Sequence, residues 1–220
     1  MIEPLPQLIT RIQAAVPGAQ VQPGPADSFY VDAAHAVAVA QFLRDDSQLR
    51  LDYASNVTGV DWLDLVTKEK VKVKKVVDGV EKDVDETIEK KRPGFLEAVY
   101  HLYSIELKHG PVTLRQRTTN RADDVRVTSL ASVWRSCEFQ EREVFDLYGV
   151  HLDGHPDLRR ILMWDGFKGY PMRKDYEEPD DYEWEPTPHA DVLAKGKAHY
   201  PAPATAAAAP GGAASLPKAK

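Results

Sequence analysis

The chain has 220 residues, of which 43% are hydrophobic, and this length and composition favour one globular domain with extensions. The formal net charge is −6, from 28 Lys and Arg against 34 Asp and Glu, so no overall basic field favours nucleic acid or anionic lipid as a partner. A single cysteine, Cys137, excludes a disulfide framework and an all-cysteine zinc or iron–sulfur site within the chain, and it fits a reducing compartment.

The amino-terminal residues lack a basic region followed by an apolar region, which a secretory signal requires. No stretch of the chain approaches the apolar length that spans a bilayer. We therefore expect a chain that faces the cytosol and associates with a membrane through partners only.

Two helices and a short strand are predicted near the amino terminus. Apolar residues at helical spacing predict a first helix over residues 4–16, closed by a Pro-Gly pair. Residues 28–31 are typical of a short strand. Asp32 then follows as the expected cap of a second helix over residues 33–46.

A charged hairpin is predicted after the next strand. Residues 49–62 begin with the alternation typical of a strand. Over residues 67–92, valines alternate or nearly alternate with lysines in the first arm, and Asp78 and Gly79 supply the residues of a tight type I′ turn. The second arm is rich in carboxylates, so opposite charges can face each other across the strands. We favour a solvated, self-neutralised β-hairpin insertion over a basic arm that grips nucleic acid.

A second pair of strands completes the predicted fold. Residues 95–107 and 111–119 are strand-like, and the connection between them has Gly110 in its turn. The elements over residues 1–153 predict an α+β fold, with helices packed on a small mixed sheet that is mostly antiparallel.

The strongest helical pattern covers residues 132–149, with Gly149 placed to end the helix. One face of this helix is apolar, with Val133, Cys137, Val144, Leu147 and Tyr148. The opposite face carries opposite charges three or four residues apart: Arg135, Glu138, Arg142 and Asp146. This spacing predicts an exposed ladder of ion pairs, each stabilising the helix by only about 0.2–0.5 kcal/mol.

Residues 154–176 match neither helix nor strand, because glycines and prolines interrupt them, yet they are rich in apolar and aromatic residues. Their mixture of Trp, Tyr, Met and Arg is typical of surfaces that proteins bury against each other. The adjacent Arg159 and Arg160 suit bidentate bonding to carboxylates as a fork. We predict a long irregular interface segment over residues 154–186, partly folded over the preceding helix and partly covered by another subunit.

The last residues, 187–220, are mostly Ala, Pro and Gly and have little to bury. Such a composition does not offset the entropy of ordering, so we expect a low-complexity, disordered tail. The acidic residues just before it are expected to be extended and solvated.

His151 and His155, with Asp153 between them, raise the alternative of a metal site or of proton transfer in a stand-alone metal-dependent enzyme. Gly154 and Pro156 break the register that would place both imidazoles on one side, and no third ligand follows at a characteristic spacing. We therefore prefer one surface histidine and one packed histidine that bonds a backbone carbonyl.

Residues 141–176 closely resemble the signature of the 30 kDa subunit family of the proton-pumping NADH:quinone oxidoreductase, respiratory complex I. Weaker similarity extends upstream through residues 42–46, 60–62 and 99–104. The charged hairpin and the Ala/Pro-rich tail look like additions to the family pattern. The matching positions of the signature are Glu141, Arg142, Glu143, Asp146, Gly149, Gly154, His155, Pro156, Asp157, Leu158, Arg159, Arg160, Ile161, Leu162 and Asp165.

The resemblance implies a non-catalytic structural subunit of the peripheral arm, beside the subunit that lines the quinone cavity, in an assembly that oxidises NADH and translocates protons. It implies no cofactor or metal in this chain, with flavin and iron–sulfur clusters in partner subunits. The expected location is peripheral, on the cytoplasmic face of the cell inner membrane. An equivalent subunit of a related membrane-bound hydrogenase-like or other quinone-reducing complex is the alternative, because this chain does not reveal the electron donor.

The expected contacts with partner subunits come from the signature and from the element that closes it. No catalytic, cofactor-binding or metal-ligating residue is assigned in this chain. The predicted interface residues are Glu141, Arg142, Glu143, Asp146, His155, Asp157, Arg159, Arg160, Trp164, Arg173 and Asp175.

Overall fold

The computed structural model describes residues 3–77, 80–122 and 125–177, and over residues 68–88 it describes the backbone alone. The predicted turn at Asp78 and Gly79, the end of the predicted interface segment and the predicted tail lie outside the described residues. Within the described part, the irregular residues after 153 belong to the same compact unit as the helices and sheet, up to Glu177.

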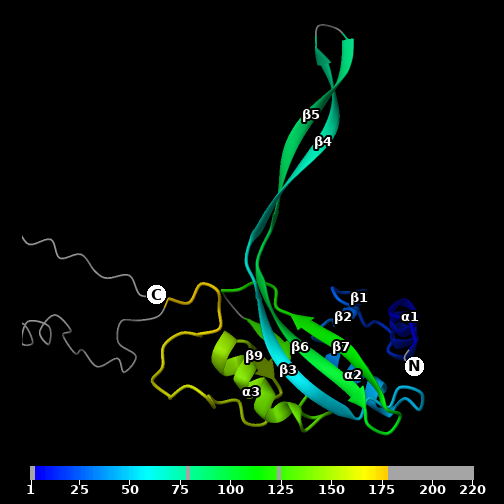
Figure 1. Ribbon diagram of the computed structural model, residues 1–220, viewed down its shortest axis with the longest axis vertical. Coiled ribbons are helices and arrows are strands. Elements are labelled where there is room, and N and C mark those ends of the chain that lie inside the picture. The colour runs from blue at the N-terminus through cyan, green and yellow to red at the C-terminus, as the bar shows by residue number, and fades with distance from the viewer. Residues whose placement is uncertain (1–2, 78–79, 123–124, 178–220) are drawn as a thin grey trace, which may run out of the picture. The chain divides into compact units, whose positions relative to one another are not determined.

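A five-stranded mixed sheet in the order β1-β2-β7-β6-β3 forms the centre of this unit (Figure 1). Neighbouring strands are antiparallel except β2 and β7, which are parallel. This arrangement confirms the predicted α+β fold with a mixed, mostly antiparallel sheet. The strands are β1 (Val21–Pro23), β2 (Ser28–Val31), β3 (Tyr53–Trp62), β6 (Phe95–Ser104) and β7 (His109–Arg117).

Three α-helices accompany the sheet in the described part of the chain: α1 (Leu5–Ala15), α2 (Ala36–Asp45) and α3 (Cys137–Tyr148). The predicted cap of α2 is wrong, because residues 33–35 form a turn and the helix begins only after His35. The carboxylate of Asp32 instead accepts the N–H of Gln20 at 2.8 Å and lies 2.6 Å from Nδ1 of His35.

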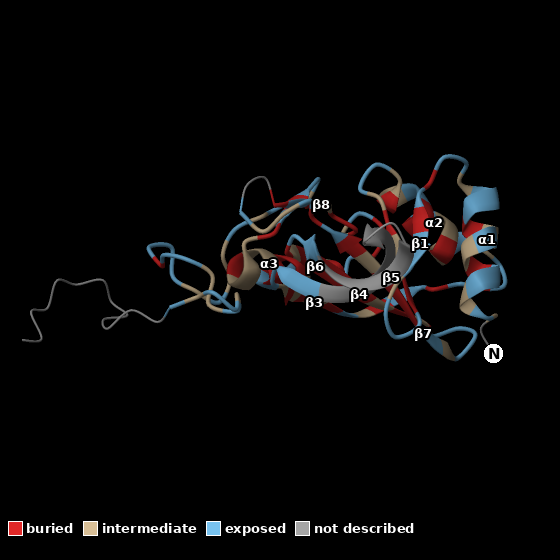
Figure 2. Ribbon diagram, turned by 90° about the horizontal axis from the view of Figure 1, so that it is seen from above, coloured by how far each residue is buried: buried red, intermediate tan, exposed pale blue. Residues whose placement is uncertain are grey.

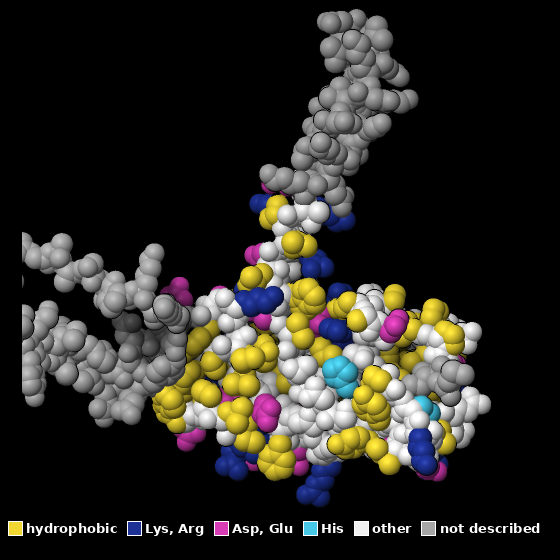
Figure 3. Space-filling model, in the orientation of Figure 1, with side chains coloured by type: hydrophobic (Ala, Val, Ile, Leu, Met, Phe, Trp, Pro, Cys, Tyr) yellow, Lys and Arg dark blue, Asp and Glu magenta, His cyan; other side chains and the backbone are white. Residues whose placement is uncertain are grey.

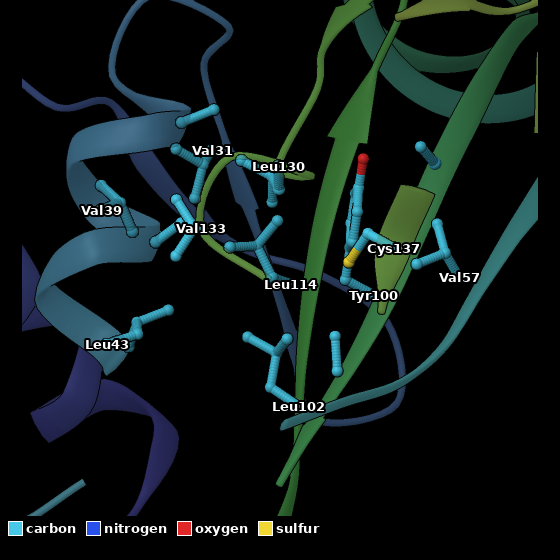
Figure 4. Packing of buried hydrophobic residues seen from close by; sticks show 14 of the residues in the cluster. Val31, Val39, Leu43, Val57, Tyr100, Leu102, Leu114, Leu130, Val133 and Cys137 are labelled. Carbon is cyan, nitrogen blue, oxygen red and sulfur yellow. The ribbon is translucent and has the colours of Figure 1, made fainter. Parts of the chain in front are cut away.

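The hydrophobic core lies between the sheet and the helices. Alternate residues of β6 are fully buried on the core side, among them Tyr100 and Leu102, as the period of a strand requires. Figure 4 shows Leu43 of α2 and Cys137 of α3 among the core residues that surround these strands. The buried residues (red) gather within this layer in Figure 2.

The turn between β6 and β7 differs from the prediction. Residues 105–108 form the turn, β7 begins at His109, and Gly110 lies within the strand rather than in the turn. Side chains explain the earlier turn, since Asp52 accepts the N–H of Ile105 at 2.8 Å and Ser104 Oγ accepts the N–H of Leu107 at 3.0 Å.

The predicted charged hairpin is formed by β4 (Leu65–Val77) and β5 (Val80–Arg92), which pair antiparallel as a separate two-stranded sheet. The register places Lys72 opposite Asp85 and Lys74 opposite Asp83, as predicted, but it also places Lys75 opposite Lys82. Among the described strands, β4 and β5 pair only with each other.

The carboxyl-terminal part of the described chain begins at the end of α3. Gly149 ends the helix with φ of 71°, as predicted, and a Cβ there would also lie 2.4 Å from the Tyr170 ring. β9 (His151–Asp153) follows α3 and pairs in parallel with β8 (Arg126–Thr128), which precedes the helix. Residues 154–177 then form neither helix nor strand, in agreement with the sequence.

Candidate functional site

The irregular segment over residues 154–177, here called the interface segment, passes back beside α3 (Figure 1). Asp146, in the last turn of α3, is its main attachment. One carboxylate oxygen of Asp146 accepts the N–H groups of Ile161, Leu162 and Met163 at 3.0, 2.7 and 2.8 Å. The other accepts a hydrogen bond from Nη1 of Arg160 at 2.8 Å. Burial of the Asp146 carboxyl opposes its ionisation, but these hydrogen bonds outweigh burial and lower its pKa.

Arg142 provides the complementary donors. Its Nε and Nη2 donate to the carbonyl oxygens of Arg159 and Arg160, both at 3.1 Å, and its side chain is only 8% exposed. The predicted exposed ladder is therefore wrong at Arg142 and Asp146, which face inward and bind main-chain groups of the interface segment. Main chain without secondary structure must find other partners for its N–H and C=O groups when it is buried, and these two side chains provide them.

Arg135 and Glu138 form the exposed end of the predicted ladder. Their charged atoms are 3.9 Å apart, and the Arg135 side chain is 95% exposed. Glu143 is also exposed on α3. Glu141 is different, because it is fully buried and its carboxylate accepts hydrogen bonds from Tyr100 Oη at 3.0 Å and from the Leu130 N–H at 2.8 Å. Burial raises the pKa of Glu141 despite these bonds.

A second attachment joins the end of the interface segment to β3. Arg121 donates two hydrogen bonds to Asp61, at 2.6 and 2.7 Å, and Asp61 also accepts the N–H of Lys174 at 2.8 Å. Asp175 lies 3.0 Å from the same guanidinium, and Arg173 donates to the carbonyl of Arg121 at 3.1 Å. Burial opposes ionisation of Asp61, but the Arg121 bond and the Lys174 N–H lower its pKa.

Sequence reasoning listed Arg173 and Asp175 as interface residues but missed the attachment of this part of the chain to Asp61 and Arg121. Asp61 lies within the short upstream stretch that resembles the family, which was the only signal available. Arg121 carried no signal, since it lies in a loop 60 residues from its partner.

The two histidines are arranged as the sequence predicts, with one at the surface and one bonded to a backbone carbonyl. Nε2 of His155 donates to the carbonyl of Glu138 at 2.8 Å, and its Nδ1 accepts the N–H of Asp157 at 3.0 Å. His151 is exposed, with Nδ1 3.1 Å from Asp153. In the described ranges, no three His, Cys, Asp or Glu residues are grouped so that they could hold a metal ion.

The outward side of the interface segment carries several large apolar side chains beside its charged ones. The exposed fractions of Leu162, Trp164 and Met172 are 54%, 45% and 52%, and Phe139 of α3 is 59% exposed. Trp164 packs edge-on against Phe167, with ring centroids 4.9 Å apart. Much of this segment is pale blue or tan in Figure 2, which marks exposed and intermediate residues. Arg142 and Asp146 thus bond the main chain of the segment on its buried side, while large apolar side chains face outward.

The two adjacent arginines point to different partners. The Arg160 side chain is 17% exposed and bonds Asp146, and its guanidinium also lies 5.8 Å from the Phe167 ring centroid. The Arg159 side chain is 73% exposed and bonds only the neighbouring Asp157, at 3.0 Å, among the described residues. They do not act as one fork, and Arg159 alone is available to a partner.

Among the described residues, no helix is both long and apolar enough to cross a bilayer.

Comparison with known proteins gives a consistent family. The model of the family described as "Respiratory-chain NADH dehydrogenase, 30 Kd subunit" matches residues 29–182. The C 2 subunit of the NADH-quinone oxidoreductase of Rhizobium etli is 36% identical over 151 residues, which are 68% of this chain and 64% of that relative. The protein of the same name from Rhizobium meliloti is 34% identical over 174 residues, 78% of this chain and 79% of that relative. This chain therefore spans less than two-thirds of the length of the first of these relatives.

Among solved structures, a trypsin-resistant fragment of Nqo5 is similar over 71% of this chain and 100% of that fragment. The sequence identity is 20% and the TM-score is 0.41.

Proposed function

Because the chain belongs to the family of the 30 kDa subunit of respiratory-chain NADH dehydrogenase, we propose that it is a structural subunit in the peripheral arm of an NADH:quinone oxidoreductase. In this role it supports electron transfer from NADH to quinone coupled to proton translocation, while the redox chemistry takes place on partner subunits. Flavin and iron–sulfur clusters belong to those partners, and this chain binds none.

The observation that carries the proposal is the interface segment, whose main chain is bonded inward while Leu162, Trp164 and Met172 are exposed. A segment that is already ordered loses less conformational entropy when a partner covers it. Tryptophan is enriched among the residues that dominate binding energy at interfaces. Burying apolar surface is the main favourable contribution to most protein association. The geometry therefore suits a permanent contact with another subunit.

We assign this contact to the subunit that lines the quinone cavity, with other peripheral-arm subunits as further partners. The chain is then held at the cytoplasmic face of the cell inner membrane through its partners, without nucleic acid and without insertion into lipid. The predicted interface residues keep this role with one distinction. Arg159, Trp164 and Asp157 face outward, whereas Arg142 and Asp146 bond the main chain of the segment from the buried side.

The test replaces Leu162 and Trp164 by Ala together. The purified variant should unfold as cooperatively as the natural chain, because both side chains are exposed. In membranes, the amount of assembled complex and the NADH:quinone reductase activity should fall together. The matched control is Ile105→Ala, a 63% exposed apolar residue in the β6–β7 turn, which should assemble normally. Normal assembly and activity of the double variant would overturn the proposal.

The identity of the electron donor is tested on the same purified complex. Quinone reduction that depends on NADH supports the proposed assembly. An assembled complex that contains this chain and reduces quinone only from another donor would identify the related hydrogenase-like or quinone-reducing type instead.

A further inference from the structure

A second surface of the chain, built from strand residues, combines aromatic rings with arginines. Its rings are Tyr30 of β2, Trp62 of β3 and Phe95 of β6, and the Trp62 and Phe95 centroids are 6.1 Å apart. The Arg92 guanidinium lies 5.9 Å from the Trp62 centroid and 5.7 Å from that of Phe95. Arg117 lies 5.1 Å from Tyr30 and 5.9 Å from Phe95. We call these five residues the aromatic shelf.

The two arginines of the shelf have ring contacts but no carboxylate partner among the described residues. Glu97 is opposite Arg117 in the strand register, yet its carboxylate is fully buried and is bound by Arg115 at 2.7 Å and by the Tyr30 hydroxyl at 2.5 Å. Burial and the bond to Glu97 raise the pKa of Tyr30 to about 12, so its phenol stays neutral. Both arginines are exposed.

The contacts of Arg92 and Arg117 differ from those of other arginines in the fold. Arg115, Arg121 and Arg160 each bond a buried carboxylate. On the shelf, contact with the rings restrains the guanidiniums, and no carboxylate of a described residue pairs with their N–H edges. Restrained guanidiniums bind carboxylates at a smaller entropic cost than freely rotating ones.

The surface around the shelf is hollowed on both sides of Tyr30 and Arg117. One hollow, of about 270 Å³, is lined by the shelf together with Gly24 and Pro25. The adjoining hollow, of about 360 Å³, also contains Gln22 and Thr119. Two hollows that share a wall fit an extended chain with side chains on both sides of that wall. Figure 3 shows Lys and Arg side chains (dark blue) near the base of the β4–β5 hairpin, from which Arg92 comes.

We propose that the aromatic shelf is the docking site for an extended acidic segment of a partner protein. Its carboxylates bind the N–H edges of Arg92 and Arg117, and its apolar or aromatic residues lie on the half-buried rings. A second copy of this chain does not fit, because a two-fold contact at the shelf would bring four unpaired guanidiniums together. The net charge of −6 disfavours a polyphosphate such as nucleic acid over a short acidic segment that meets only this local cationic site. The proposal uses a different surface from the proposed function and does not depend on it.

The test is site-specific photo-crosslinking in the native assembly. p-Benzoylphenylalanine is placed at Thr119, which is exposed in the adjoining hollow, and the full chain is expressed in its source membranes. The cross-linked peptide, sequenced by mass spectrometry, should belong to another protein and contain at least two Asp or Glu residues. A link to a second copy of this chain, to lipid or to a peptide without acidic residues would overturn the proposal.

Charge variants complete the test. Arg92→Glu with Arg117→Glu should lower the cross-link yield by about tenfold, as loss of about 1.4 kcal/mol of binding does. The matched control is Arg135→Glu, another exposed arginine, which should leave the yield unchanged. If the double reversal unfolds the chain, the neutral pair Arg92→Gln and Arg117→Gln replaces it and should still reduce the yield. An unchanged cross-link yield in a folded variant refutes the proposal. This holds whatever the result of replacing Leu162 and Trp164, which tests the proposed function.

Discussion

The interface segment and the β4–β5 hairpin both lie outside the five-stranded sheet, but they differ in regular structure and in how they are attached to the rest of the fold. The segment has no regular structure, yet buried side chains such as Asp146 and Arg142 bond its main chain to α3. The hairpin has two regular 13-residue strands, yet these strands pair only with each other in the part of the chain described. Regular backbone hydrogen bonding therefore does not measure how firmly a region is attached. Attachment here depends on a few buried ionic side chains of the neighbouring elements.

The largest effect should come from Asp146→Ala. The change leaves three N–H groups of the interface segment without their acceptor and Arg160 without its carboxylate. Removing one member of a buried charge pair typically costs about 3–5 kcal/mol. Urea denaturation should show a loss of this size. Glu143→Ala, an exposed carboxylate on the same helix, is the control and should leave stability unchanged. A loss below about 1 kcal/mol would show that the attachment at Asp146 is weak.

The two adjacent arginines sharpen the comparison within the segment itself. Arg160→Ala removes a hydrogen bond to a buried carboxylate, which is worth about 1.5–3 kcal/mol. Arg159→Ala should not change the unfolding midpoint of the isolated chain, because its side chain is 73% exposed. In membranes, Arg159→Ala should instead lower the amount of assembled complex. Equal loss of stability in both variants would contradict the division between an inward and an outward arginine.

Acid should loosen the segment by protonating its attachments. The pKa values of Asp146 and Asp61 are lowered in the folded state, so their stabilisation is complete above the unfolded pKa of about 4. It is then lost as the pH falls through the lower folded-state pKa values. Limited proteolysis of residues 158–176 between pH 6 and pH 3 should show increased cleavage only at the acid end. Cleavage independent of pH would argue against the ionised carboxylates as the attachment.

The smallest effect should follow removal of the hairpin. The register pairs Thr67 with Lys90, so a two-residue Gly-Gly turn can join these positions in place of residues 68–89. We expect the free energy of unfolding to change by less than about 1 kcal/mol, since the deleted strands pair only with each other among those described. Differential scanning calorimetry measures the change. Loss of cooperative unfolding would show that the hairpin is part of the core.

Local pattern was enough to predict much of the fold. The apolar spacing located α1, the alternation located β3, and Gly149 ended α3 where a left-handed residue was required. The facing of Lys72 and Asp85 in the hairpin could also be predicted, because the two arms are adjacent in the sequence. The signature over residues 141–176 identified the family. All of these depend on residues close together in sequence, where periodicity and turn chemistry act.

Only the tertiary structure decided which charged side chains are buried. The spacing of Arg142 and Asp146 fits an exposed ion pair equally well, and their inward role depends on main-chain groups 15 to 18 residues away. The same limit applies to Asp61 and Arg121, which are 60 residues apart. A carboxylate becomes an attachment when unpaired N–H groups lie within hydrogen-bond distance of it. Sequence spacing gives its place on a helix or strand, but the path of the distant chain determines which donors reach it.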